Sequence, residues 1–159
     1  MKARVCVLLL AVLLLLAGCR APKGDYFAPF QGDFTAEVEG EWQGERLAAS
    51  FVQKGGERTV TFYAPAELCD TVLFRDAEGA LSLAVGELSL PLEGEADASF
   101  AVLVDLFPTG GEVRAISQEN DNIRIDGASF SLTFAPDGTP LAAANAAANV
   151  RVVTWRVGE

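Results

Sequence analysis

The sequence predicts a mainly β protein. We expect a single curved antiparallel sheet of about ten strands, which forms a half-open barrel and carries one inserted helix at about residues 97–107. Apolar and polar residues alternate along most segments, the turns between these segments are short, and one segment has helical spacing instead. Alternation gives each strand one apolar face, and short turns join neighbouring strands antiparallel. Such a sheet buries its apolar face by curving around it, and a helix can cover the side that stays open.

The clearest predicted strand is Phe34–Trp42, FTAEVEGEW, where the apolar residues share one face and three glutamates share the other. The later strands follow the same rule, and turns rich in Gly, Asp, Asn and Pro separate them. The alanine-rich segment Leu141–Asn149 alone would suit a helix, but its strand neighbours favour a strand. The predicted later strands are Leu47–Phe51, Thr59–Tyr63, Thr71–Arg75, Ala80–Val85, Glu87–Leu90, Val113–Ser117, Ile123–Asp126, Phe130–Phe134, Leu141–Asn149 and Val150–Val157.

One segment, Asp97–Phe107, departs from this alternation. Its apolar residues Phe100, Leu103, Val104 and Phe107 have the i, i+3, i+4, i+7 spacing of one helix face. Asp97 is a suitable N-cap, and Pro108 with the following glycines ends the helix. We expect this helix to act as a lid over the open side of the sheet.

The first residues have the pattern of a bacterial lipoprotein signal peptide. Lys2 and Arg4 precede an apolar run, Val5–Leu16, which is shorter than the about 20 residues of a membrane-spanning helix. The run ends in Leu16-Ala17-Gly18-Cys19, which resembles the bacterial lipobox. The resemblance implies that residues 1–18 are removed and that Cys19 is acylated, palmitate being a typical chain. An ordinary secretory signal with a coincidental cysteine is the alternative.

Residues 19–33 are interpreted as a lipidated N-terminus and linker, because Pro22 and Pro29 interrupt any helical pattern. We expect Phe27 and Phe30 to pack the end of this linker against the domain, residues 34–159. The protein would then lie outside the cytoplasm, anchored to the cell envelope by lipid. An aspartate directly after the anchor cysteine is associated with inner-membrane retention, and this chain has Arg20 there. In a two-membrane cell, this favours the periplasmic face of the outer membrane. In a one-membrane cell, the expected site is the outer leaflet.

Composition argues against several functions. The 141 residues from Cys19 onward contain all 22 Asp and Glu and 10 Lys and Arg, so their formal charge is −12. Nucleic acid and anionic headgroups would be repelled. The chain has no histidine, no G-x-S-x-G motif and no phosphate loop, so no enzyme activity, metal or cofactor is expected. Cys69, the single cysteine after Cys19, is expected to be a small buried apolar residue.

The order of these elements on a lipobox-bearing chain resembles the LolA/LolB-like superfamily of envelope lipoprotein carriers. The resemblance lies in FTAEVEGEWQGERLAASF, in VTFYAPAELCDTVLFRDAEG, in the helix ending in DLF, and in the PDGTPL turn. It implies a half-barrel whose hydrophobic concave face binds acyl chains under helices. Members usually open with a helix, whereas residues 20–33 show no helical period here.

Three sets of residues are candidate sites. The first is an acyl-chain groove on the concave face, although the same residues could form an ordinary packed core. Leu68, on the loop after Tyr63, could contact a membrane or a partner, or it could point inward. Glu37, Glu39 and Glu41 could attract a cation, but a solvated strand face is the simpler interpretation. The groove candidates are Phe34, Val38, Trp42, Leu47, Phe51, Phe62, Phe130, Leu132, Phe134 and Trp155.

The sequence therefore leaves two functions open. The first is a membrane-anchored protein that binds an acyl chain or a lipoprotein. The alternative is a structural or interaction lipoprotein with a filled core and a protein partner. A cavity would favour the first, and a closed core with an exposed apolar patch would favour the second.

Overall fold

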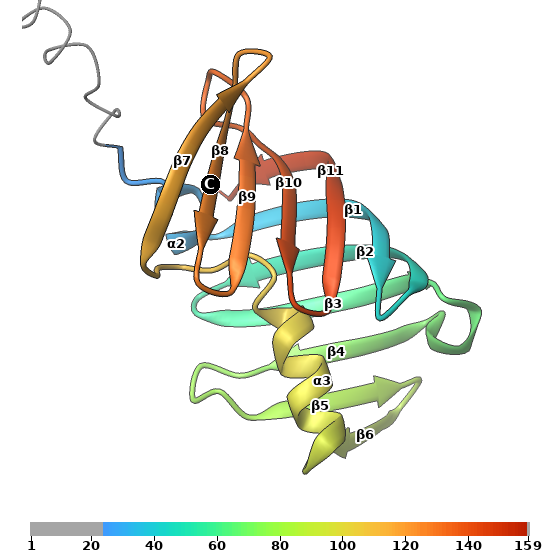
Figure 1. Cartoon of the computed structure of the whole chain (residues 1–159). Helices are drawn as coiled ribbons and strands as arrows, with labels where there is room; N and C mark the ends of the chain where they lie inside the picture. Colours follow the sequence, from blue (N-terminus) through green and yellow to red (C-terminus); the bar gives the residue numbers. More distant parts are fainter. Residues whose placement is uncertain (1–23, 159) are drawn as a thin grey trace, which may run out of the picture.

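The computed structural model describes residues 24–158, which form one curved, unclosed antiparallel sheet of eleven strands (Figure 1). The predicted fold class is confirmed. The signal peptide, Cys19 and the linker up to residue 23 lie outside the described residues. The strands are β1 (Phe34–Trp42), β2 (Glu45–Lys54), β3 (Glu57–Ala64), β4 (Thr71–Arg75), β5 (Leu81–Val85), β6 (Leu88–Pro91), β7 (Val113–Glu119), β8 (Asn122–Gly127), β9 (Phe130–Phe134), β10 (Pro140–Asn145) and β11 (Ala148–Val157).

The helices are short and few among these residues. They are α2 (Ala28–Gln31), the 3₁₀ turn η1 (Ala66–Leu68) and α3 (Glu95–Val104). The strand order is β6-β5-β4-β3-β2-β1-β11-β10-β9-β8-β7, so β1 lies at the centre and pairs with both β2 and β11. The chain runs outward by hairpins to one edge at β6. Helix α3 then crosses the inner face, and the chain continues from the other edge at β7 back to β11 (Figure 1).

Helix α3 begins and ends earlier than the sequence predicted. Gly94, with φ 69°, is the N-cap, so Asp97 lies inside the first turn instead of capping it. The helix ends at Val104, where the Leu106 amide bonds the Leu103 carbonyl and tightens the last turn. Phe107 therefore lies beyond the helix, although it is buried as predicted from the helical spacing.

The alanine-rich segment predicted as one strand, Leu141–Asn149, is a hairpin. It comprises most of β10, a turn at Ala146 and Ala147, and the start of β11. The Asn145 side chain causes the turn, because its Oδ1 accepts hydrogen bonds from the backbone amides of Ala147 (3.0 Å) and Ala148 (2.9 Å).

Strand β11 bends sharply around β1. The register shifts between Glu37 and Val38, which leaves Val153 as an extra residue in β11. Because of this bulge, Trp155 pairs with Ala36 and reaches the inner face, which strict alternation from Val150 would not allow. At Gly40 the two backbones lie so close that a Cβ would be 2.1 Å from the Asn149 carbonyl oxygen, so only glycine fits there.

The segment before β1 belongs to the packed domain. The ring of Phe30, on α2, is fully buried, and the ring of Phe27 contacts that of Phe130 edge-on at 5.6 Å. This confirms the expected packing of both rings. A four-residue helix with Pro29 in its first turn places Phe30 in the core.

Candidate functional site: a cleft beside helix α3

The predicted groove residues lie together on the inner face, but they are packed as core. Eight of them are less than 9% exposed, whereas Phe130 and Trp155 are half-buried. Leu47 and Phe62 have no exposed surface, so they face no void large enough for water. Four residues from α3 and the loop after it fill the space above them, together with Phe30. These four are Leu103, Val104, Leu106 and Phe107, while Phe100 of α3 is half-buried.

Aromatic rings make up much of this core. Phe30 contacts Phe34, Phe107, Phe134 and Trp155, with ring centroids 5.4–6.2 Å apart. A second group lies under α3, where the ring centroid of Trp42 is 6.1 Å from that of Phe62 and 5.2 Å from that of Phe100. The indole Nε1 of Trp42 is the one buried side-chain nitrogen or oxygen in the described residues without a hydrogen-bond partner.

A buried polar network fastens the end of α3 to the sheet. The Arg58 side chain, on β3, donates to the Val104 carbonyl (2.9 Å) and to Gln53 Oε1 (2.7 Å). Gln53 in turn donates to the carbonyls of Phe30 and Gly32. The network thus joins α2, β2, β3 and the C-terminus of α3, where a cation is favoured by the helix dipole.

Asp105 supplies the negative charge of this network. Its Oδ1 lies 2.5 Å from Arg75 and 3.4 Å from Arg58. Burial lowers the pKa of Arg58 to about 10, with help from Arg75, and Asp105 opposes both effects. Arg58 therefore remains a cation at neutral pH. Arg58 was not among the predicted site residues, although it shares its strand face with Val60 and Phe62, and a charge on a buried face is a signal of pairing.

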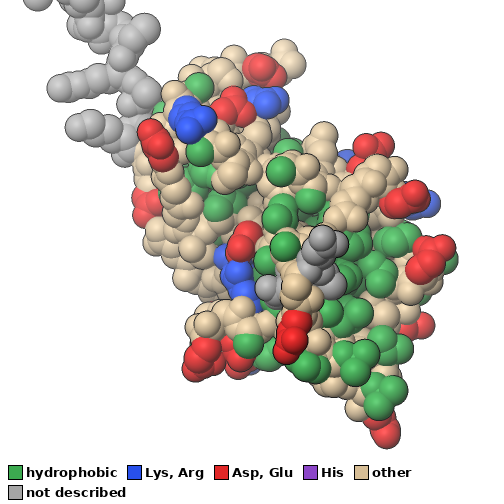
Figure 2. Space-filling view, turned by 60° about the horizontal axis from the view of Figure 1, so that its bottom comes forward, with side chains coloured by type: hydrophobic (Ala, Val, Ile, Leu, Met, Phe, Trp, Pro, Cys, Tyr) green, Lys and Arg blue, Asp and Glu red, His purple; other side chains and the backbone are tan. Residues whose placement is uncertain are grey.

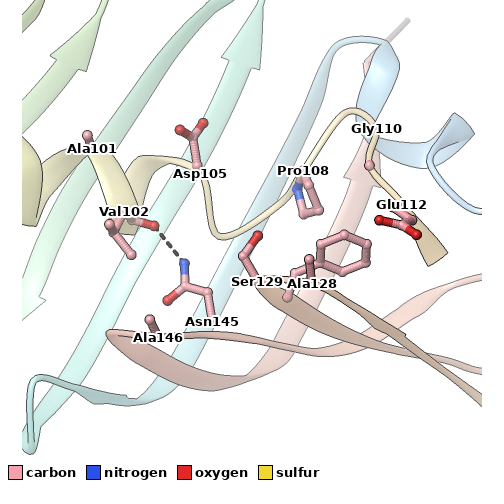
Figure 3. A pocket seen from close by; sticks show the side chains of 12 residues that line it. Ala101, Val102, Asp105, Pro108, Gly110, Glu112, Ala128, Ser129, Asn145 and Ala146 are labelled. Carbon is pink, nitrogen blue, oxygen red and sulfur yellow. Dashed lines mark hydrogen bonds between the residues drawn. The ribbon is translucent and has the colours of Figure 1, made fainter. Parts of the chain in front are cut away.

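Beside the end of α3, a partly open cleft of about 390 Å³ separates the helix from the turns of the β8–β9 and β10–β11 hairpins (Figure 3). Its volume lies within the range of ligand pockets, roughly 300–1,000 Å³. The twelve lining residues are Ala101, Val102, Asp105, Pro108, Gly110, Gly111, Glu112, Ala128, Ser129, Phe130, Asn145 and Ala146.

Local contacts hold the walls of the cleft in place. Asn145 Nδ2 donates to the Val102 carbonyl (2.6 Å), which ties the β10–β11 turn to α3 (Figure 3). The Phe130 ring lies against Gly127 and Gly111, where an added Cβ would come within 2.2 Å and 2.8 Å of it. Glycine at these two positions therefore makes room for the ring that lines the cleft.

The two charged side chains that line the cleft, Asp105 and Glu112, are both acidic. Asp105 is paired with Arg75 and Arg58, which leaves Glu112 as the unpaired charge, and none of the lining residues is basic. Most of the remaining wall is Ala, Val, Pro, Gly and Phe. Of the predicted groove residues, Phe130 alone lines this cleft. The other lining residues of the cleft were not predicted, because most of them are small residues in turns and carry no periodic signal.

The remaining sequence candidates lie elsewhere. Leu68, in η1, is half-buried and packs against the core. Cys69 is exposed, and its thiol donates to the Tyr63 carbonyl (3.0 Å), so the prediction of a buried Cys69 is wrong. The reason is that η1 ends at Leu68 and turns the next side chain outward.

The acidic face of β1 is solvated, in agreement with the simpler interpretation of its three glutamates. Glu39 accepts a hydrogen bond from Arg151 (2.6 Å), and this contact lowers the pKa of its carboxyl group. Within the described part of the chain, no three His, Cys, Asp or Glu side chains are placed to hold a metal. No helix between residues 24 and 158 is long and apolar enough to cross a bilayer.

Comparison with known proteins bears on the fold. No protein-family model and no curated protein matches the sequence. The chain is similar to a solved structure, an uncharacterized conserved protein from Thermus thermophilus, with a TM-score of 0.55. The two sequences are 14% identical, and the match covers 85% of this chain and 84% of that one. At this identity the likeness establishes a shared fold.

Proposed function

We propose that this protein is a lipid-anchored extracytoplasmic protein that holds an acyl chain in the cleft beside α3. The observation that carries the proposal is the cleft itself, an apolar and partly open space beside a filled core. Burying apolar surface in it contributes about 25 cal/mol per Å². The sequence pattern resembles that of LolA/LolB-like carriers, and this resemblance supports an acyl chain as the ligand. Here the cleft would hold the chain instead of a broad groove.

The charge of the cleft restricts the ligand further. A free fatty acid would bring its carboxylate toward Glu112, and like charges at close range disfavour binding. An acyl chain in ester or amide linkage carries no such charge near the chain. We therefore favour the acyl chain of a lipoprotein or of a neutral lipid over a free fatty acid.

The anchor in this proposal is Cys19, preceded by Leu16-Ala17-Gly18. Two or three acyl chains hold a protein stably at a membrane. The domain would then meet its ligand at the membrane surface. Metabolic labelling with radioactive palmitate tests this part, and label that persists in a Cys19→Ser variant would contradict it.

The cleft is tested by titration with a fluorescently labelled monoacylglycerol. All described strands, helices and core contacts lie in residues 24–158, so a chain that begins at Arg20 holds the whole fold without lipid. We expect Val102→Arg to weaken binding at least about tenfold, because the cation would enter an apolar wall. Val102 is 36% exposed, so the fold should tolerate the change.

Val153→Arg is the matched control, since Val153 is 51% exposed on β11 and lies outside the cleft. Its affinity should equal that of the unchanged chain, and a labelled fatty acid should bind more weakly than the monoacylglycerol. Equal binding by all three chains would contradict the cleft as the site.

A further inference from the structure

A second apolar surface lies on the inner face of the β5–β6 hairpin. Val85, Leu88 and Leu90 are 50%, 70% and 58% exposed. Leu88 pairs with Val85, and Leu90 pairs with Leu83, which packs against the core. These residues therefore continue the apolar inner face beyond the area that α3 covers. We name Val85, Leu88 and Leu90 the β5–β6 patch.

The patch is accessible because β6 is an edge strand and all four of its residues are exposed. Figure 2 shows hydrophobic side chains gathered at this end of the molecule, beside α3, with carboxylates around them. Three large apolar side chains on one face of neighbouring strands differ from scattered surface residues, and such patches mark interaction sites. None of the three lines the cleft.

The surroundings of the patch are strongly acidic. Residues 76–94, which contain β5 and β6, hold four Asp and Glu and no Lys or Arg, and the basic residue just before them is Arg75. Arg75 is bound to Asp105, so its charge is already neutralised. Glu87 lies in the turn of the hairpin itself, and exposed Glu93 follows β6.

From this combination we infer that the β5–β6 patch docks a basic amphipathic segment of a partner protein. Leucine-like side chains of the partner would cover Leu88 and Leu90, and its Lys or Arg would face the surrounding carboxylates. Long basic side chains suit this arrangement, because their methylene stems can cover apolar surface while the charge stays at the rim.

Charge also disfavours the other possible occupants. An anionic membrane surface would be repelled by the carboxylates around the patch. A second copy of the chain would bring the same negative surround against it. A basic segment alone complements both the apolar centre and the acidic rim.

Fluorescence anisotropy tests the inference with a labelled amphipathic peptide of leucine and lysine, and with its leucine and glutamate counterpart. The protein is the chain from Arg20 onward, which holds the whole described fold. We expect the lysine peptide to bind at least about tenfold more tightly than the glutamate peptide. The double variant Leu88→Ser with Leu90→Ser should weaken binding of the lysine peptide about tenfold or more. Glu87→Lys with Glu93→Lys should also weaken this binding and reduce its dependence on salt concentration.

Val153→Ser, at a similarly exposed valine, and Val102→Arg, in the cleft, should both leave peptide binding unchanged. If Val102→Arg loses monoacylglycerol binding but keeps peptide binding, the β5–β6 patch acts independently of the cleft in the proposed function. Equal binding of the two peptides, or full binding by the leucine-to-serine variant, would overturn the inference. So would patch-dependent binding to vesicles of phosphatidylcholine and phosphatidylglycerol, or patch-dependent self-association on gel filtration.

Discussion

Replacing Phe30 with alanine is expected to lower the free energy of unfolding by about 3–5 kcal/mol, as large-to-small changes of buried aromatic residues do. The ring has no exposed surface and contacts four other aromatic rings on β1, β9, β11 and the loop after α3. Its loss would leave a cavity that these elements cannot easily close. Urea unfolding followed by tryptophan fluorescence measures the change, since Trp155 lies 5.4 Å from the ring.

Phe27→Ala is the control for this experiment. Phe27 is half-buried and makes one described ring contact, with Phe130, so a smaller loss is expected. A loss below about 1 kcal/mol for Phe30→Ala, the range of surface changes, would show that α2 does not belong to the core.

The second large effect concerns Arg58. Arg58→Ala is expected to lower the free energy of unfolding by about 3 kcal/mol, because it leaves buried partners without their hydrogen bonds. Gln53 Oε1 and the Val104 carbonyl would both lose a charged donor. Hydrogen exchange should also show faster opening of the last turn of α3, where Val104 lies.

Arg75→Ala separates the buried network from surface charge. Arg75 and Asp105 form an ion pair whose side chains are 22% and 55% exposed, and such pairs contribute about 0–1 kcal/mol. Equal losses for Arg58→Ala and Arg75→Ala would mean that charge at Asp105, and not the buried hydrogen bonds, holds the helix.

Local pattern was sufficient to predict most of the sheet. Alternation predicted the observed bounds of β1, Phe34–Trp42, and the turn at residues 76–79 helped to predict those of β4, Thr71–Arg75. The helical spacing likewise identified α3. Its ends were missed, because Gly94 and the tightened turn after Val104 depend on how the helix crosses the sheet.

The candidate site was less predictable, for a physical reason. The ten predicted groove residues do share the inner face, but whether that face is hollow depends on what fills it from elsewhere in the chain. Phe30 and residues from α3 and the loop after it fill most of it. The cleft is defined by Val102, Phe130 and Asn145, which come from three separate elements, and no short-range pattern connects them.

The cleft beside α3 is central to the proposed function, as the place where an acyl chain is held. Photo-crosslinking with a diazirine-labelled monoacylglycerol, followed by peptide mapping, tests this most directly. We predict that the label attaches to the walls of the cleft, in α3 near Val102 and in the β8–β9 turn near Phe130. Labelling confined to Leu88 and Leu90 on β6, or spread evenly over the surface, would contradict it.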